Sequence, residues 1–151
     1  MIRRATLADH AVIVSVVDQW WGGRRMAALV PSLFLEHFSG TSFVAEDDSG
    51  DMVGFLVGFR SQDRPDEAYV HFIGVRPDVR GRGVGRALHH EFATCVAERG
   101  VSTIRCVTST SNTDSVAFHL RIGFQVDGHD APVVVEGLDD AVGHVRLSRS
   151  L

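Results

Sequence analysis

The strongest chemical signal in this sequence is a turn rich in glycine and arginine, Arg80-Gly81-Arg82-Gly83-Val84-Gly85. An apolar run ending in Val75-Arg76-Pro77 precedes the turn, and an amphipathic stretch over residues 84–99 follows it. Glycine has no Cβ, so a ligand can approach its backbone closely. The start of a helix suits an anion, because it presents unpaired N–H groups and a partial positive charge. The pattern therefore predicts a cradle for a pyrophosphate group where a strand turns into a helix.

The turn matches neither of two common nucleotide-binding fingerprints. A P-loop ends in Gly-Lys-Ser/Thr, and this chain contains no lysine. A dinucleotide-binding fold has Gly-x-Gly-x-x-Gly and an acidic residue about 20 positions later. Here the spacing is Arg-x-x-Gly-x-Gly, so a different class of phosphate-bearing ligand is indicated.

The composition excludes several classes of protein. Of the 151 residues, 44% are hydrophobic and 23% are charged, which is typical of a globular domain. A formal net charge of -4 argues against nucleic acid as the main partner, because phosphate neutralisation requires a basic surface. No apolar run is long enough for a membrane span or a signal peptide. Cys95 and Cys106 lack metal-ligand spacing, so we expect no metal, and reduced thiols in a cytoplasmic protein. The length and the absence of a linker predict one domain over residues 1–151.

Hydrophobic periodicity and turn residues predict alternating helices and strands that would position this turn. The expected helices cover residues 9–19, 31–38, 84–99 and 111–121. The expected strands cover residues 42–46, 52–59, 68–75, 101–108, 124–126 and 144–148. Most of residues 127–143 is expected to be a loop, with brief pairing at residues 133–135. An antiparallel hairpin followed by helices between strands predicts an α/β fold with a mixed sheet.

Two motifs resemble those of one enzyme family. Arg-x-x-Gly-x-Gly, with Val-x-Pro upstream, resembles the acyl-CoA-binding motif of the GNAT N-acetyltransferase superfamily. The run Asn112-x-x-Ser115-x-x-Phe118-His119-x-x-x-Gly123-Phe124 resembles its second signature. The resemblance covers nearly the whole chain. It implies a single-domain GNAT-like fold whose mixed, largely antiparallel sheet has splayed central strands and flanking helices.

The resemblance also implies acetyl-CoA as co-substrate, with its pyrophosphate held by the backbone amides of the turn. Val75, at the end of a strand, is expected to offer its backbone N–H to the thioester carbonyl as an oxyanion donor. The residues expected to bind the cofactor are Ile73, Val75, Arg80, Gly81, Arg82, Gly83, Val84, Gly85, Arg86, Asn112, Ser115 and Phe118.

His119 stands where the family usually has a tyrosine near the thioester sulfur. A tyrosine there can protonate the leaving thiolate, and His119 could do so by donating an N–H. The alternative is that His119 packs against its helix and the thiolate leaves unassisted. The family pattern does not decide between these two roles, so catalysis by His119 is a hypothesis.

The reaction needs a neutral amine, so a general base is expected. The strand before the glycine turn carries no carboxylate at the usual position, but it carries His71. A mostly neutral imidazole can accept a proton, directly or through water. The alternative is a histidine that is satisfied within the core, with Glu67 and Glu46 as substitute bases.

The acceptor side is expected around Trp20, Trp21 and Arg24, between the first two helices, with Tyr69 on the strand that carries His71. Two tryptophans could hold an aromatic or cationic amine, whereas Arg24 and Arg25 could bind a carboxylate of an amino acid or peptide. The acidic residues Asp130, Glu136, Asp139 and Asp140 would instead suit a polyamine or an aminoglycoside, with a solvated acidic loop as the alternative. Hydrophobic packing with a solvated arginine remains the alternative to any of these roles.

The function expected from these residues and from the resemblance is acetyl transfer from acetyl-CoA to a primary amine of a small molecule, by direct attack in a ternary complex. Two alternatives stay open: peptide or protein N-acetylation, and a non-catalytic module that binds acyl-CoA. Neither nucleic acid nor a membrane is expected as a partner, and a homodimer is left open.

Overall fold

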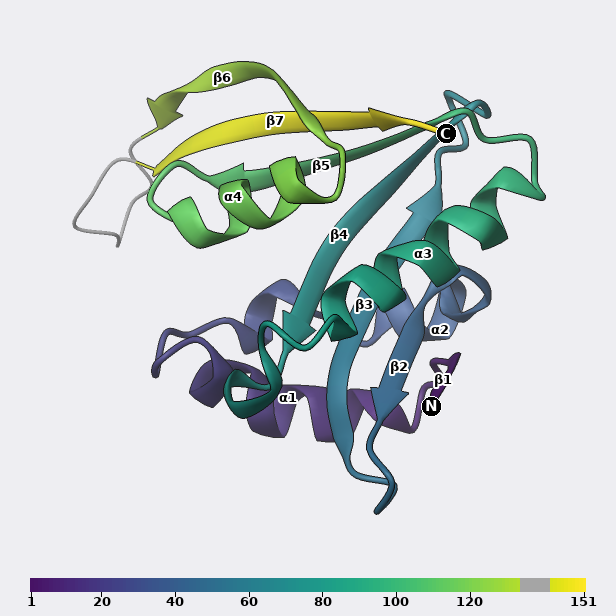
Figure 1. Ribbon diagram of the computed structural model, residues 1–151, viewed down its shortest axis with the longest axis vertical. Helices are drawn as coiled ribbons and strands as arrows, with labels where there is room; N and C mark the ends of the chain where they lie inside the picture. The colour runs from purple at the N-terminus through teal and green to yellow at the C-terminus, as the bar shows by residue number, and fades with distance from the viewer. Residues whose placement is uncertain (134–141) are drawn as a thin grey trace.

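A seven-stranded sheet organises the molecule in the computed structural model, which describes residues 1–133 and 142–151 (Figure 1). Within this part of the chain the strand order is β1-β2-β3-β4-β5-β7-β6, and β4–β5 is the one parallel pair. The strands are β1 (Ile2–Arg4), β2 (Phe43–Glu46), β3 (Met52–Arg60), β4 (Glu67–Val75), β5 (Thr103–Ser109), β6 (Gln125–Val133) and β7 (Val142–Ser150). The predicted α/β fold with a mixed, largely antiparallel sheet is confirmed.

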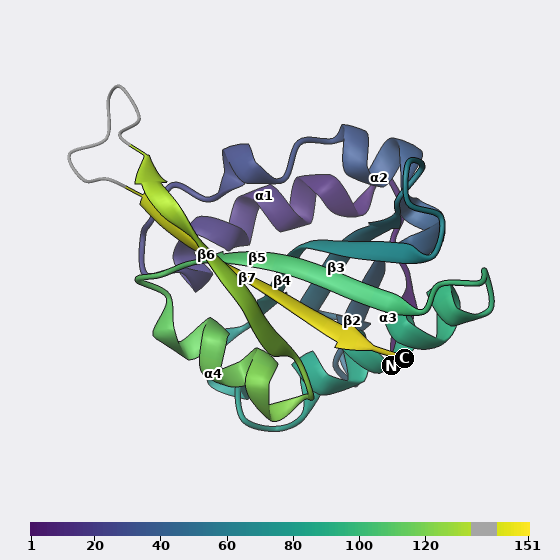
Figure 2. The same ribbon diagram turned by 90° about the horizontal axis from the view of Figure 1, so that it is seen from above.

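Helices cover both faces of the sheet (Figure 2). The helices α1 (Asp9–Trp20) and α2 (Leu33–His37) lie on one face, and α3 (Val84–Ala97) and α4 (Thr113–Arg121) lie on the other. Short 3-10 turns are η1 (Ala27–Leu29), η2 (Ser39–Thr41) and η3 (Pro77–Val79). None of the helices in residues 1–133 and 142–151 has the length and apolar character needed to cross a bilayer.

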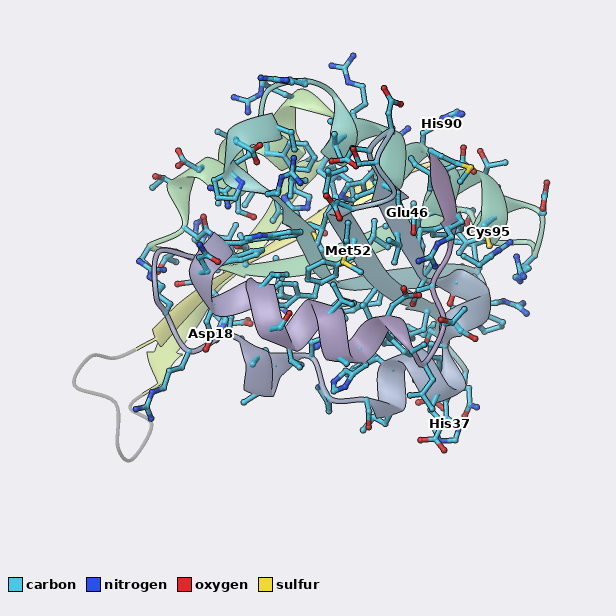
Figure 3. The ribbon with its side chains drawn as sticks, turned by 90° about the horizontal axis from the view of Figure 1, so that it is seen from below. Asp18, His37, Glu46, Met52, His90 and Cys95 are labelled. Atoms are coloured by element: carbon cyan, nitrogen blue, oxygen red, sulfur yellow. The ribbon has the colours of Figure 1, made fainter. Side chains whose placement is uncertain are left out.

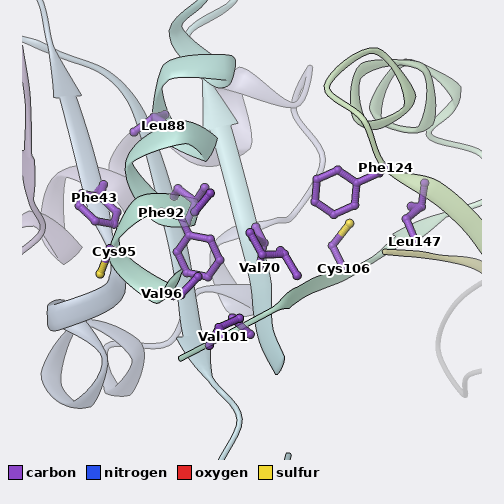
Figure 4. Packing of buried hydrophobic residues seen from close by; sticks show 14 of the residues in the cluster. Phe43, Val70, Leu88, Phe92, Cys95, Val96, Val101, Cys106, Phe124 and Leu147 are labelled. Atoms are coloured by element: carbon purple, nitrogen blue, oxygen red, sulfur yellow. The ribbon is translucent and has the colours of Figure 1, made fainter. Parts of the chain in front are cut away.

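Two apolar clusters hold these layers together. Under α3, the fully buried Leu88, Phe92 and Val96 pack toward the sheet, where Val70 and Cys106 lie in the same cluster (Figure 4). The expected apolar stripe of this helix is thus buried as its 3.6-residue period predicts. A second cluster lies under α1 and is built around Ile13, Val17, Trp20, Phe55 and Phe72.

A β-bulge in β4 changes which face of the sheet its side chains meet. Gly58 pairs with Val70 while the adjacent Val57 pairs with Phe72, so His71 is an extra residue on β4. Val70 therefore belongs to the cluster under α3, whereas Phe72 belongs to the cluster under α1. Ile73, beyond the bulge, again packs toward the α3 side.

The same bulge marks the point where β4 and β5 part. The parallel pairing runs only from Glu67 opposite Thr103 to Val70 opposite Cys106. Beyond Val70, β4 continues beside β3, while β5 continues beside β7 as far as Ser109. Figure 1 shows the two strands diverging from their shared end. The splayed central strands implied by the family resemblance are present.

Two parts of the sheet differ from the sequence expectation. The short β1 pairs with β2 and has no counterpart in the predicted elements. The prediction of a loop from residue 127 is wrong for residues 127–133, because β6 continues to Val133 along β7. β6 is an edge strand, where Pro132 and the register shift near Gly128 are tolerated. Val133 pairs with Val142, and the rest of the expected 133–135 pairing lies outside the described residues.

Candidate active site

A cavity of about 910 Å³ lies where the carboxyl end of β4, the start of α3 and the first turns of α4 meet. Trp20 and Trp21, at the end of α1, form another of its walls. Asp114 is the one carboxylate among the described lining residues, while four cations line the same space: Arg24, Arg80, Arg86 and Arg121. The excess of positive charge favours a ligand that carries several negative charges.

The structure brings most of the predicted site residues into this one cavity. All residues predicted to bind the cofactor line it except Arg82, which is exposed nearby, and so do Trp20, Trp21 and Arg24. His71, His119 and Tyr69 are not among the described lining residues. Their roles, like those of the lining residues, remain predictions.

The glycine turn leaves backbone N–H donors unpaired at the start of α3. Gly81 (φ 78°) and Gly83 (φ 89°) adopt the left-handed conformation that side chains disfavour. Gly83 occupies the N-cap position and has no side chain to accept from the helix. The first internal helical bond runs from the Ala87 N–H to the Gly83 carbonyl at 2.9 Å. The amides of the first turn before Ala87 are therefore available to a bound anion.

Gly85 allows α4 to approach α3 closely. A Cβ at this buried position would lie 3.0 Å from Cζ of Phe118. Phe118 lines the cavity from α4, so this contact sets the width of the cavity between the two helices. A side chain at position 85 would push them apart.

The backbone of Val75 faces the space opened by the splay. The N–H of Arg76 donates to the Val53 carbonyl on β3 at 2.9 Å. Because successive N–H groups alternate between the edges of a strand, the Val75 N–H points to the other edge. β5 has left that edge by this point, since its pairing with β4 stops at Val70. A main-chain donor is thus directed into the cavity, as the oxyanion prediction requires.

The arginines around the turn differ in what they contact. Arg76 pairs with Asp78 at 2.7 Å and with Asp47 at 3.4 Å, so its charge is already engaged. Arg80 donates from Nε to the Val75 carbonyl at 3.0 Å and from Nη2 to the Trp20 carbonyl at 2.6 Å. Arg86 is exposed on the first turn of α3 and lines the cavity.

The α4 side of the cavity begins with Asn112, which caps the helix. Its side-chain oxygen accepts from the Ser115 N–H at 3.2 Å. Sequence reasoning found Asn112, Ser115 and Phe118 but missed several residues on the same side: Ser111, Thr113, Asp114, Ala117, Arg121 and Ile122. Asp114, Phe118 and Arg121 recur at helical spacing, and this pattern indicates that they share the face of α4 that lines the cavity.

His119 faces the core rather than the cavity. It is 3% exposed, and its Nδ1 donates to the Ser115 carbonyl at 2.7 Å. Its ring lies edge-on to His89 at 5.3 Å and to Phe124 at 5.1 Å. Burial lowers the pKa of His119, which the bond to Ser115 only partly offsets. This geometry favours the packing interpretation and gives no support to a proton donor for the thiolate.

His71 lies on the bulge of β4 and contacts the helical layer on the α1 face. Its Nε2 is 2.6 Å from the Leu29 carbonyl, which can only accept, so Nε2 carries the proton. In the neutral ring Nδ1 then holds the lone pair. The ring stacks on Phe34 with centroids 4.1 Å apart.

The two substitute bases lie in ion pairs away from the cavity. Glu67, at the opposite end of β4 from Val75, accepts from Arg105 at 2.9 Å, and this contact lowers its pKa. Glu46 accepts from Arg3 at 2.8 Å, and Figure 3 shows Glu46 apart from the labelled Asp18 at the end of α1. Neither carboxylate is among the described lining residues of the cavity.

The wall predicted to contact the acceptor is stabilised by aromatic contacts and by one carboxylate. Trp20 packs on Phe55 at 6.0 Å between ring centroids, and Trp21 packs on Phe72 at 5.0 Å. Asp18 accepts from the N–H groups of Met26 and Ala27 at 2.7 and 2.8 Å, which fixes the turn after α1. Contacts within the chain therefore hold this wall in place.

Two further acceptor predictions lie elsewhere. Tyr69 stacks on Phe59 at 5.6 Å, and burial raises the pKa of its hydroxyl. This position does not bring it to the cavity. Asp130 pairs with Arg146 at 3.1 Å. Glu136, Asp139 and Asp140 lie outside the described residues.

Comparison with known proteins agrees with this geometry. The sequence model of the Acetyltransferase (GNAT) family matches residues 13–124. The chain is 39% identical over 90 residues to the L-2,4-diaminobutyric acid acetyltransferase of Nocardia farcinica, covering 60% of this chain and 46% of that protein. It is 35% identical over 88 residues to the mycothiol acetyltransferase of Propionibacterium freudenreichii subsp. shermanii, covering 58% and 28%. The chain thus spans less than half the length of these two relatives.

The fold also matches a solved structure over its whole length. A Salmonella typhimurium protein solved with its cofactor acetyl-CoA superposes with a TM-score of 0.78 at 19% identity, covering 100% of this chain and 93% of that one. Acetyl-CoA is the co-substrate of this family, as the two motifs implied. Because the family model covers most of the sequence and both motifs line one cavity, this chain belongs to the acetyltransferase (GNAT) family.

Proposed function

We propose that this chain is an acetyl-CoA-dependent N-acetyltransferase that acts on a primary amine of a small molecule by direct attack in a ternary complex. The observation that carries the proposal is the single cavity shared by the glycine turn, the splayed end of β4 and the two tryptophans. Its volume of about 910 Å³ lies in the range of small-molecule and cofactor sites.

Each part of acetyl-CoA has a matching surface in this proposal. The pyrophosphate binds the amides at the start of α3, with Arg86 beside them. The pantetheine arm runs along Asn112, Ser115 and Phe118 of the α4 side. The thioester carbonyl then meets the Val75 N–H in the splay, where a developing negative charge on oxygen is stabilised.

The transfer step needs few side chains. The amine nitrogen forms a bond to the thioester carbon, the C–S bond breaks, and the CoA thiolate leaves. The ammonium proton passes to Nδ1 of His71, the ring nitrogen that holds the lone pair, through water where contact is not direct. The thiolate departs without help from His119, which faces the core. A thiol pKa of about 8.5 makes this departure reasonable.

The acceptor in this proposal is a small amine that also carries a carboxylate. Trp20, Trp21 and Arg24 share one region of the cavity, and an arginine is well matched to a carboxylate. The relative from Nocardia farcinica is named for a diamino acid, which combines these two groups.

The test is release of free thiol from acetyl-CoA in the presence of a panel of amines: diamino acids, aromatic amines, polyamines and short peptides. The proposal expects turnover with small amines, fastest with those that carry a carboxylate. Faster transfer to peptide N-termini would favour peptide acetylation. Tight binding of acetyl-CoA with no transfer to any amine would favour the binding module.

A further inference from the structure

Arg80 connects two parts of the chain that both line the cavity. Its Nη2 donates to the Trp20 carbonyl at 2.6 Å, across a sequence separation of 60 residues, and its Nε donates to the Val75 carbonyl at 3.0 Å. The first bond holds the end of α1, and the second holds the end of β4. Both acceptors are main-chain oxygens, so the connection fixes backbone rather than a flexible side chain.

The bond to Trp20 compensates a gap in α1. The last carbonyls of a helix lack intrahelical partners and carry partial negative charge, which a cation stabilises. The last turn of α1 contains no basic residue. Arg80 supplies that cation from the turn before α3 and so holds the segment that carries Trp20 and Trp21.

The bond from Arg80 to the Val75 carbonyl holds the peptide group that directly follows the predicted oxyanion donor, the Val75 N–H. The carbonyl of Val75 shares its residue with the N–H that faces the splay, and β5 is no longer there to orient this edge of β4. Arg80 replaces the missing strand partner on the carbonyl. This side chain thus orients one edge of the end of β4, while the Arg76 N–H bond to Val53 holds the other edge.

We propose that Arg80 is a positioning residue that fixes the acceptor wall, Trp20 and Trp21, against the reactive end of β4, rather than a ligand of the pyrophosphate. This assignment rests on the proposed function for its kinetic consequence. The arginines of the cavity then have different roles. Arg80 has two donors committed to main-chain carbonyls, while Arg86 lies on the first turn of α3 beside the free amides.

The experiment compares Arg80→Ala with the matched variant Arg86→Ala in the full chain. The chain has two tryptophans, and both belong to the acceptor wall, so intrinsic fluorescence reports on that wall directly. Arg80→Ala should shift tryptophan emission to the red, raise quenching by acrylamide and lower kcat/KM for the acceptor by about tenfold or more. Its Kd for acetyl-CoA, measured by calorimetry, should stay close to that of the parent.

Arg86→Ala should give the opposite pattern: a Kd for acetyl-CoA weaker by about tenfold and unchanged tryptophan emission. Arg80→Lys keeps the charge and a single donating nitrogen near the end of α1, and should recover part of the acceptor kcat/KM. Melting temperatures accompany each variant, because a loss of folding would alter every readout together.

The assignment is overturned if Arg80→Ala weakens acetyl-CoA binding as much as Arg86→Ala does while the tryptophan emission stays that of the parent. If the parent transfers acetyl to no amine, the proposed function fails instead. The emission and acetyl-CoA measurements still decide the role of Arg80 in that case, so the two failures are distinguishable.

Discussion

The turn before α3 and the contact between α3 and α4 both contain polar groups without a hydrogen-bond partner in the described residues. These groups are open to the cavity in the turn and buried in the contact. In the turn, glycines leave the first amides of α3 open to the cavity. In the contact, both ring nitrogens of His89 and Nε2 of His119 are buried without a hydrogen-bond partner in the described residues. Figure 2 shows α3 and α4 on the same face of the sheet.

The role of an unpaired polar group therefore depends on its surroundings. Where the group borders a cavity, a ligand can supply the partner, and the deficit becomes binding energy. Where the group is buried among aromatic rings, as His89 is beside Phe118 and Phe124, the described residues offer it no partner. The first region should therefore respond to acetyl-CoA, and the second should respond to pH.

The largest expected effect compares His71 on β4, the proposed proton acceptor, with His119 in the contact between α3 and α4. His71→Ala should lower kcat by about 100-fold, because the proposed proton acceptor is lost. The acetyl-CoA affinity should not change, since His71 is not among the described lining residues. Steady-state rates at saturating acetyl-CoA measure this.

The matched control is His119→Phe, which keeps an aromatic ring in the core. It should retain the parent rate, at a lower melting temperature because the bond to Ser115 is gone. Equal rates for the parent and His71→Ala would show that His71 is not the general base. A slow His119→Phe enzyme of normal stability would restore the proton-donor hypothesis.

The next effect is a loss of stability in acid that originates in the α3–α4 contact. Burial lowers the pKa of His89 to about 3, and the nearby His119 and Arg149 act in the same direction. The unfolded chain binds a proton near pH 6.5 while the native state does not, so the stability is present above this pH and declines below it. His89 should account for about 2 kcal/mol of lost stability between pH 7 and pH 5.

Urea denaturation of the parent and of His89→Leu at the two pH values tests this. Leucine fills a similar volume and cannot be protonated, so the variant should be less sensitive to acid. An identical pH dependence in the two proteins would show that His89 is not the acid-sensitive group.

A smaller effect is expected where the two regions touch. Gly85→Ala puts a methyl group 3.0 Å from Cζ of Phe118. The helices must separate slightly, at a cost of about 1 kcal/mol in the free energy of unfolding. The midpoint of urea denaturation measures the loss. An unchanged or higher midpoint would mean that Phe118 moves aside without strain, and that the contact does not set the cavity width.

Most of the residues that line the cavity could be predicted from the sequence, because the signals for them are local. Glycines 81 and 83 adopt the positive φ that their spacing suggested, and a helix begins directly after them. Asn112 and Ser115 follow a strand at the start of a helix, as the second motif implied. These features depend on short stretches of chain, and short stretches carry their own conformational preferences.

What the sequence did not predict depends on contacts between distant segments. The pattern from Tyr69 to Ile73 gives no sign of a bulge, because aromatic and aliphatic residues occupy both faces of β4. The direction of His119 depends on how α4 is rotated: Val116, one turn earlier, also packs toward the core. β1 is three residues long and exists only because β2 offers an edge.

A pair of glycine substitutions tests whether the open amides of the turn bind acetyl-CoA. Gly83→Ala and Gly100→Ala are matched, with φ values of 89° and 83° and no atom within 4 Å of the added Cβ. Both should lose about 1 kcal/mol of stability from the strained backbone. In calorimetric titration with acetyl-CoA, Gly83→Ala should bind about tenfold more weakly than the parent, whereas Gly100→Ala should bind normally. Equal affinities for the two variants would contradict the account.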